Sequence, residues 1–347
     1  LQLEDLPMKS SKSKTQNLNS DQQFIKKIKL IKRSPKLGRV YEIYREEQQA
    51  TLCNTTLTRQ NKIWLKHLSI IEDHRIDKLE PLFIQKKILK PIFIKEKYTT
   101  CVYTARLLVT ILDFSVACNL ISRNPLKEIF TLPLLKKAAQ QQTKQIQHRV
   151  TLPYDNLRTE LMQVIKTFNQ KSSLRRQLLL EISLRTILRP REVTSLKITD
   201  LNEDEHTLTV YKTKTLDKFV IPTSSRLEQC LKDAYKNFGS STENWIFAGI
   251  RDQKQPLSSQ TLNKALKDLG FKNKLCAHGL RSVASNYFAS HSDIIHPWTA
   301  EAMLQHAVGS AVARAYRRDN YFSERVKASK IWNDFIDGIY KQLRIEI

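Results

Sequence analysis

One short segment in the second half of the chain places two residues that could act together on a phosphate group. His278 and Arg281 stand three positions apart, a spacing that puts both side chains on one face of a helix. A histidine can transfer protons, and a guanidinium group can hold two phosphate oxygens in a bidentate contact. Taken alone, such a pair is more often structural than functional.

Three further segments carry residues of suitable type. Arg189 stands directly before Pro190, and proline favours the first position of a helix, so we expect a helix to begin there. Tyr316, ten residues after His306, lies among arginines that could stabilise a phenolate and make it a nucleophile. Lys214 falls in an expected turn. Each of these residues also has a structural explanation. Arginines and lysines at such positions are commonly surface residues, and a tyrosine near arginines commonly packs against its neighbours.

Hydrophobic periodicity and turn signals predict the elements that position these residues. Residues 206–211 and 219–222 are rich in β-branched and aromatic side chains and flank a polar turn, which predicts a hairpin. We expect helices at 155–169 and 174–188, and most of the chain after residue 224 is helical in pattern. The pattern predicts a mainly α fold with a small antiparallel β-sheet.

The sequence divides into four expected regions. Residues 1–50 have the composition of a basic N-terminal tail or arm, and residues 51–134 have the periodicity of a compact helical domain. The polar, Gln-rich segment 135–150 is expected to be a linker. Residues 151–347 form the second domain, whose amphipathic tail at about 324–343 could dock on its own domain or on a neighbouring copy.

The charge of the chain indicates a polyanionic partner. The formal net charge is +24, from 58 Lys and Arg against 34 Asp and Glu. Basic side chains that neutralise phosphates release counterions and so raise affinity without reading sequence. The candidate DNA contacts in the basic stretch and the linker are Lys26, Lys27, Lys29, Lys32, Arg33, Lys144 and Arg149.

The five cysteines form no CxxC pair or His/Cys cluster, and no apolar run reaches a membrane-spanning length. We therefore expect an intracellular protein with free thiols, no metal site and no membrane partner.

The order of the candidate residues resembles that of the tyrosine recombinase family, and within it the phage and genomic-island integrases. The family order is arginine, hairpin lysine, His-x-x-Arg, a second histidine and tyrosine, which here are Arg189, Lys214, His278, Arg281, His306 and Tyr316. The segment MLQHAVGSAVARAYRRDNYFSER is similar to the end of the island-type integrases. The resemblance covers about residues 60–340.

This resemblance implies a reaction and a role for each residue. Tyr316 would attack a DNA phosphodiester and form a 3′-phosphotyrosyl link, while Arg189 and Arg281 neutralise the transition state. Lys214 would protonate the leaving 5′-oxygen, and His278 would act as base toward the tyrosine. In addition, His306 would hydrogen-bond the phosphate and Glu192 would support this cluster. No metal or other cofactor is implied.

The resemblance also implies partners and an architecture. The helical region would be a core-binding, SAM-like domain that forms a C-shaped clamp on duplex DNA with the catalytic domain. The family recombines double-stranded attachment sites as a tetramer, with accessory DNA-bending or directionality factors.

Several positions depart from the family pattern. Glycines are usual two residues before and two residues after the first arginine, where this chain has Ile187 and Arg191, and Ser282 replaces a frequent second histidine. Tyr321 is a second candidate nucleophile, although the offset of Tyr316 from His306 matches the family.

Other functions stay open at this point. A non-catalytic DNA-binding protein could keep the fold, and a type IB topoisomerase would share the chemistry. A metal-dependent nuclease would be an enzyme of another mechanism. An RNA-binding or structural protein has only the net charge in its favour and gives no reason for the His278 and Arg281 pair.

Overall fold

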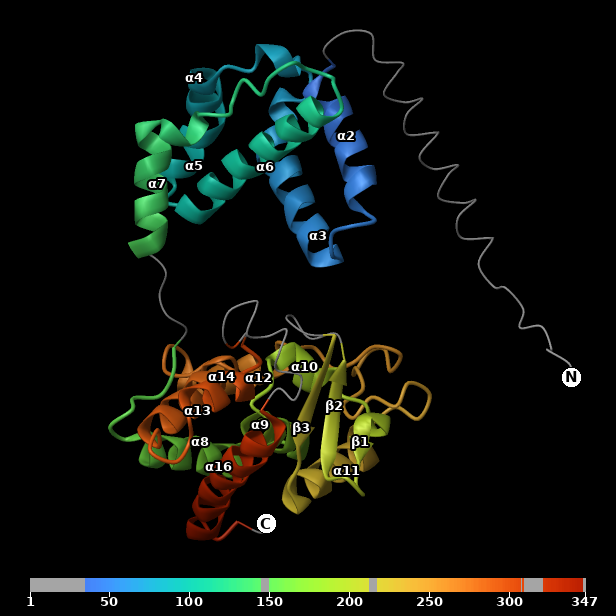
Figure 1. Ribbon diagram of the computed structural model, residues 1–347, viewed down its shortest axis with the longest axis vertical. Coiled ribbons are helices and arrows are strands. Elements are labelled where there is room, and N and C mark those ends of the chain that lie inside the picture. The colour runs from blue at the N-terminus through green and yellow to red at the C-terminus, as the bar shows by residue number, and fades with distance from the viewer. Residues whose placement is uncertain (1–34, 145–149, 212–216, 307, 309–320, 346–347) are drawn as a thin grey trace, which may run out of the picture. The chain divides into compact units, whose positions relative to one another are not determined.

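The computed structural model has two compact units, Leu1–Gln147 and His148–Ile347 (Figure 1). The residues that it describes are 35–144, 150–211, 217–306, 308 and 321–345. The expected mainly α fold with a small antiparallel sheet is confirmed.

The first unit is helical. Its elements are α2 (Leu37–Gln48), α3 (Asn54–Ile63), α4 (Pro81–Ile84), α5 (Lys90–Ile94), α6 (Tyr98–Ala117) and α7 (Pro133–Lys144), the π-helical segments η1 (Trp64–Leu68) and η4 (Gln85–Leu89), and the 3-10 turns η2 (Ser69–Ile71), η3 (Ile76–Lys78) and η5 (Ile129–Thr131).

Helix α6 forms the centre of this unit. Cys101, Ala105, Leu108 and Ile111 are buried along it, and α2, α5 and α7 pack against it. By length and composition α6 could cross a membrane, but half of its most apolar window is buried inside the unit. Core packing therefore accounts for its apolar character.

Two expected boundaries in this half of the chain are wrong. Helix α2 lies inside the expected tail of residues 1–50, and its Tyr41 ring stacks on Trp64 with 3.8 Å between centroids. Helix α7 occupies most of the expected linker at 135–150, and its Ala138 is fully buried. Both segments belong to the packed helical unit.

The second unit combines helices with one sheet. Its elements are α8 (Leu157–Lys171), α9 (Leu174–Thr186), α10 (Pro190–Thr194), η6 (Ile198–Asp200), β1 (Leu201–Asn202), β2 (Thr207–Tyr211), β3 (Lys218–Pro222), α11 (Ser225–Phe238), α12 (Thr261–Leu266), the π-helical η7 (Lys267–Phe271), α13 (Gly279–Ser290), α14 (Pro297–Met303) and α16 (Phe322–Gln342).

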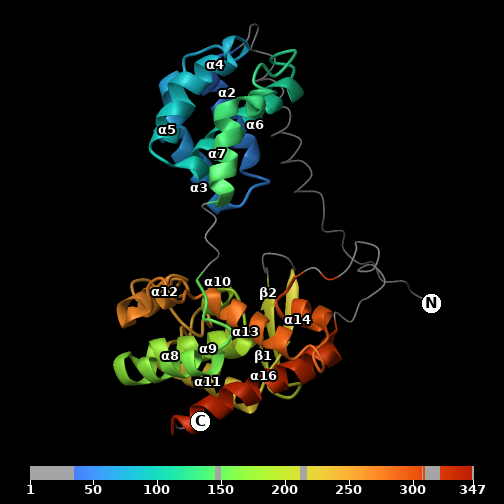
Figure 2. The ribbon, with the colours of Figure 1, turned by 90° about the vertical axis from the view of Figure 1, so that its left-hand side faces the viewer.

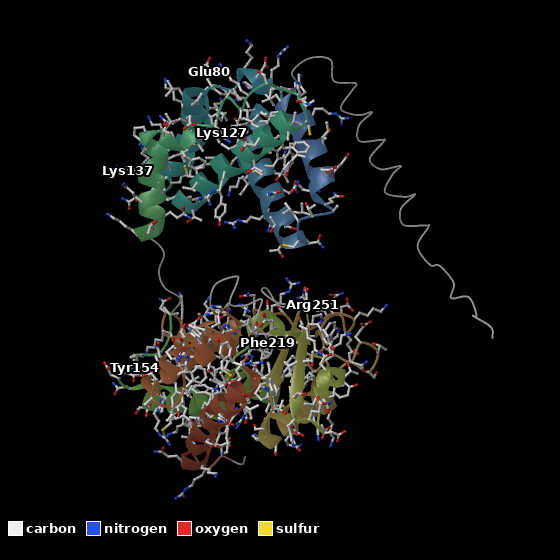
Figure 3. All side chains as sticks on the ribbon, viewed as in Figure 1. Glu80, Lys127, Lys137, Tyr154, Phe219 and Arg251 are labelled. Carbon is white, nitrogen blue, oxygen red and sulfur yellow. The ribbon has the colours of Figure 1, made fainter. Side chains whose placement is uncertain are left out.

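The sheet is antiparallel in the order β1-β2-β3, and Tyr211 lies opposite Lys218 at the end of the β2–β3 pair. This confirms the expected hairpin. Phe219 lies inside the unit, whereas the side chains of Tyr154 and Arg251 lie at its surface (Figure 3).

Helix α9 is the centre of the second unit. Every residue from Leu178 to Thr186 is buried, because α8, α10, α11, α12, α13 and α16 all contact this helix (Figure 2). A helical segment that is buried on all sides, as this one is from Leu178 to Thr186, shows no amphipathic stripe. Its C-terminal end at Thr186 is thereby fixed in the core, three residues before Arg189.

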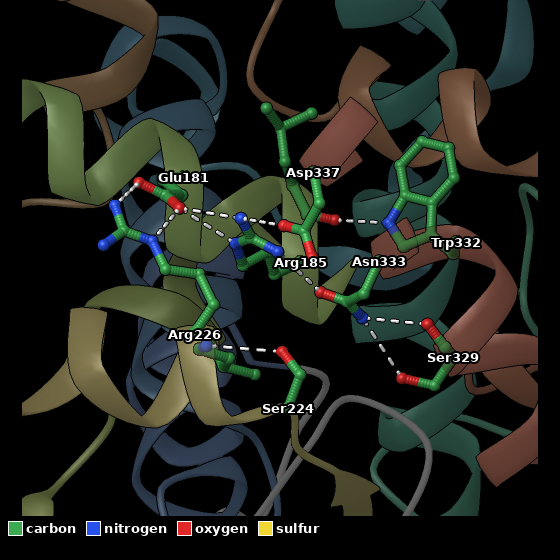
Figure 4. A network of polar contacts seen from close by, with 10 residues as sticks. Glu181, Arg185, Ser224, Arg226, Ser329, Trp332, Asn333 and Asp337 are labelled. Carbon is green, nitrogen blue, oxygen red and sulfur yellow. Dashed lines mark hydrogen bonds and ion pairs between the residues drawn. The ribbon is translucent and has the colours of Figure 1, made fainter. Parts of the chain in front are cut away.

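A buried polar network ties α9 to α11 and α16 (Figure 4). The Arg185 guanidinium pairs with Glu181 at 2.9 Å and with Asp337 at 2.7 Å, and Arg226 pairs with Glu181 at 2.8 Å. Burial alone would raise the pKa of Glu181, but bonds from Arg226 and the charge of Arg185 lower it. The Trp332 indole donates to the Leu184 carbonyl at 2.8 Å. Helix α16 therefore packs on its own unit.

We predict that Arg185→Leu lowers the free energy of unfolding by about 3–5 kcal/mol, because it removes one partner from a buried ionic network. The matched control is Arg176→Leu on the same helix. Arg176 makes a partly exposed pair with Asp268 at 3.2 Å, so its loss should cost under about 1 kcal/mol. Urea unfolding followed by circular dichroism measures both, and equal losses would contradict the assignment.

Candidate active site

The first candidate residue stands at a corner between two helices. Helix α9 ends at Thr186, Ile187 adopts a left-handed conformation with φ of 56°, and α10 begins at Pro190. The expected helix start at Pro190 is confirmed. Arg189 is thus placed directly before the first turn of α10.

Glu192 holds Arg189 in this position. Its carboxylate accepts from the Arg189 backbone N–H at 3.0 Å and from the Arg189 Nη1 at 3.0 Å. Glu192 is buried, so the pair is shielded from water. Within the described part of the chain the Nε and Nη2 atoms of Arg189 have no hydrogen-bond partner, which leaves one edge of the guanidinium for an anion.

Arg281 joins three segments of the unit. It lies in the first turn of α13, is 5% exposed, and donates through Nη1 to the Ile187 carbonyl and through Nη2 to the Leu304 carbonyl. The left-handed turn at Ile187 occurs at one of these acceptors, and the other acceptor, Leu304, stands two residues before His306. The two expected arginines are therefore brought to the same corner.

The charge of this corner is not balanced. Burial, followed by the positive charge of Arg189, lowers the pKa of Arg281 to about 10, and Glu192 only partly opposes this shift. The group still carries its charge at neutral pH, because its pKa remains well above 7. Two neighbouring guanidinium groups with one carboxylate suit the binding of an anion.

Gln305 is a site residue that we did not predict. Its φ is 54° and it is 2% exposed. Its side-chain oxygen accepts from Arg189 Nη1, and its nitrogen donates to Glu192 at 3.1 Å. A positive φ cannot be read from a single sequence, so only its position beside His306 could have pointed to it.

The two histidines are placed differently. His306 is about half exposed, and its Nδ1 lies 2.6 Å from a Glu301 oxygen, which orients the ring. His278 is partly buried and directly precedes α13. The next residue, Gly279, packs closely against the backbone of Val150. A Cβ added at Gly279 would lie 2.3 Å from the Val150 carbonyl oxygen.

The second half of the chain is similar to known integrases. Residues 151–322 match the model of the phage integrase family. The chain belongs to this family of tyrosine recombinases. Prophage integrase IntA of Escherichia coli K12 is 31% identical over 179 residues, which are 51% of this chain and 42% of that protein. Prophage integrase IntZ of the same strain is 24% identical over 66% of this chain and 53% of its own length.

Solved structures of two integrases share the fold. A lambda integrase dimer bound to a COC′ core site superposes with a TM-score of 0.59 at 19% identity, over 89% of this chain and 82% of that one. The Tn1549 transposon integrase in complex with circular intermediate DNA gives 0.58 at 15% identity, over 85% and 99%. The curated relatives above, in contrast, are matched over only about half of their length.

Ile187 stands at a position where integrases usually have glycine. The backbone keeps the left-handed conformation that glycine would favour, at a cost of about 1–2 kcal/mol for a side chain with a Cβ. Ile187 is 2% exposed, so burial of its side chain offsets this cost. Arg191 is exposed and adds a surface charge.

Several expected residues lie outside the described part of the chain. They are Lys214, Tyr316, Lys26, Lys27, Lys29, Lys32, Arg33 and Arg149. Lys144 is the last residue of α7. Tyr321 is described: it precedes α16, and its ring lies edge-on to Trp298 with 6.4 Å between centroids. The expected roles of all these residues remain predictions.

We predict opposite effects of the same substitution at two helical glycines. Gly279→Ala should lower the free energy of unfolding by about 1–3 kcal/mol, because the new Cβ would collide with the Val150 backbone. Gly338→Ala on α16 should raise it by about 0.5–1 kcal/mol, since the nearest atom there is an Arg158 nitrogen at 3.5 Å. Thermal unfolding measures both, and stabilisation by Gly279→Ala would contradict the close approach.

Proposed function

We propose that this integrase-family chain cuts and rejoins DNA strands, with Tyr316 as the nucleophile. The observation that carries the proposal is the corner at which Arg189 and Arg281 meet with an unbalanced positive charge. Such a corner can stabilise the negative charge that gathers on a phosphate in its transition state. The family match supports the identity of the tyrosine.

The proposed step exchanges one phosphodiester for another. The Tyr316 oxygen attacks phosphorus, the bond from phosphorus to the 5′-oxygen breaks, and a 3′-phosphotyrosyl link forms. Lys214 gives a proton to the leaving 5′-oxygen, and His278 takes the proton of the tyrosine. A 5′-hydroxyl from a partner strand then reverses the step, so no external energy source is needed.

The remaining site residues bind the phosphate or position the residues that do. His306, oriented by Glu301, would hydrogen-bond a non-bridging oxygen. Glu192 and Gln305 would hold Arg189 at the angle at which its outer edge faces the phosphate. Arg281 uses two of its five N–H donors on carbonyls, so it would contribute its charge and its remaining donors.

We further propose the partner and the assembly. One similar lambda integrase structure is a tetramer bound to a Holliday junction. By analogy, this chain would act inside the cell as a tetramer on two double-stranded attachment sites. The two units would clamp the duplex, aided by the N-terminal basic segment, Lys144 and Arg149, and by accessory DNA-bending or directionality factors.

The test is a suicide substrate built on the attachment core, which direct repeats flanking the integrated element would reveal. A nick beside the cleavage point lets the short fragment that carries the new 5′-hydroxyl diffuse away. The strand then cannot be resealed, and the covalent intermediate accumulates. The wild-type chain should give a denaturant-stable protein–DNA adduct, and Tyr316→Phe should reduce it to background. Tyr321→Phe, the same chemical change, should leave it intact.

Each rival function predicts a different outcome. An adduct that persists in Tyr316→Phe but is lost in Tyr321→Phe would reassign the nucleophile. Absence of any wild-type adduct on its own site would favour a non-catalytic binding protein. Cleavage that EDTA abolishes would indicate a nuclease, and relaxation without exchange between two marked duplexes would indicate a topoisomerase.

A further inference from the structure

The loop that carries His278 is held by two other segments of the second unit. Residues 275–279, which end at the first residue of α13, form this loop. Its backbone is joined to Val150 and Thr151, the first described residues of the unit, and to Asn263 on α12. We call residues 275–279 the histidine loop.

Asn263 holds the residue directly before His278. Its side-chain oxygen accepts from the Ala277 backbone N–H at 2.8 Å, and its side-chain nitrogen donates to the Gln260 side-chain oxygen at 3.2 Å. Ala277 precedes α13, so a hydrogen bond within that helix cannot satisfy its N–H. Ala277 is also buried, and a buried N–H that loses its acceptor costs free energy. The Asn263 oxygen therefore fixes the backbone on this side of His278.

Thr151 holds the residue directly after His278. Its hydroxyl donates to the Gly279 carbonyl at 3.1 Å, and the neighbouring Val150 carbonyl accepts from the Cys276 N–H at 3.3 Å. Gly279 makes these contacts possible, because a Cβ at this position would collide with the Val150 carbonyl oxygen. The backbone is thus fixed on both sides of His278.

These contacts act on the histidine more than on the arginine of the His278 and Arg281 pair. Arg281 is held separately, through the carbonyls of Ile187 and Leu304. The His278 ring has only two side-chain torsions, so its position follows that of its backbone. A general base must lie within hydrogen-bond distance of the proton that it takes, and a displacement of about 1 Å can cost about 100-fold in rate. Small shifts of the histidine loop therefore have a large chemical effect.

We propose that Thr151 and Asn263 are positioning residues that set the place of His278 during DNA cleavage. This inference rests on the proposed function, in which His278 takes the proton of Tyr316. Neither residue needs to touch DNA or the tyrosine, because each acts through the backbone of the histidine loop. The sequence did not indicate them, since the contacts join positions 128 and 14 residues apart in the chain.

The first test measures the rate of adduct formation by the full chain on the suicide substrate at saturating DNA. Thr151→Val and Asn263→Leu each remove one contact to the loop with little change in volume, and each should slow the rate about 5- to 20-fold. Thr151→Ser keeps the hydroxyl and Asn263→Asp keeps the acceptor oxygen, so both should stay within about threefold of wild type. Thr159→Val, the same change at an exposed position of α8, should stay within about twofold.

The second test separates positioning of the base from a general loss of structure. His278→Gln removes the base and should slow adduct formation about 100- to 1,000-fold. Once the base is absent its position no longer matters, so adding Thr151→Val or Asn263→Leu to His278→Gln should change the rate by under about twofold. A purely structural role would slow each double variant further, by the same factor as in the single variant.

Wild-type rates in Thr151→Val and Asn263→Leu, or equal slowing with and without His278, would overturn the positioning role. So would a failure of Thr151→Ser and Asn263→Asp to keep the rate. Circular dichroism verifies that each variant is folded, and the Asn263 pair tests the proposal independently of the Thr151 pair. These outcomes defeat only the positioning role when the wild-type chain still forms the adduct, whereas absence of the wild-type adduct defeats the proposed function.

Discussion

The site in the second unit depends on the buried guanidinium of Arg281. Its two Nη atoms bond the carbonyls of Ile187 and Leu304, so one side chain fixes the end of α9, the start of α13 and the segment that leads to His306. Arg189 and Gln305 flank these two acceptors in the chain. Hydrogen bonds from Arg189 to Gln305 and from Gln305 to Glu192 join two of these segments a second time, whereas Arg281 also brings in α13.

The unit compensates for a site that carries unfavourable charge and backbone conformation. Burial beside Arg189 disfavours the charged form of Arg281, and both Ile187 and Gln305 have positive φ. Such features persist where surrounding structure holds them in place. Here the support comes from α9, which is buried from Leu178 to Thr186 and is anchored through Arg185 to α16 and through Glu181 to α11. The scaffold and the site therefore share one helix.

The sequence predicted the parts of this arrangement that rest on local chemistry. The hairpin and the helix start at Pro190 follow from turn signals and proline geometry, and the family comparison confirms the fold. Helix α7 was missed because its few core residues, such as Ala138, stand among glutamines and lysines. Gln305 was missed because its role depends on a left-handed backbone and on contacts distant in sequence, to Arg189 and Glu192.

The role of Arg281 in joining the three segments is tested most directly by the free energy of unfolding of Arg281→Lys, measured by urea titration. Lysine keeps the charge, but its single ammonium group cannot reproduce the planar fork that reaches two carbonyls in opposite segments. We predict a loss of at least about 2 kcal/mol, because buried carbonyls would lose their donors. Stability within about 0.5 kcal/mol of wild type would contradict the claim that Arg281 holds the corner together.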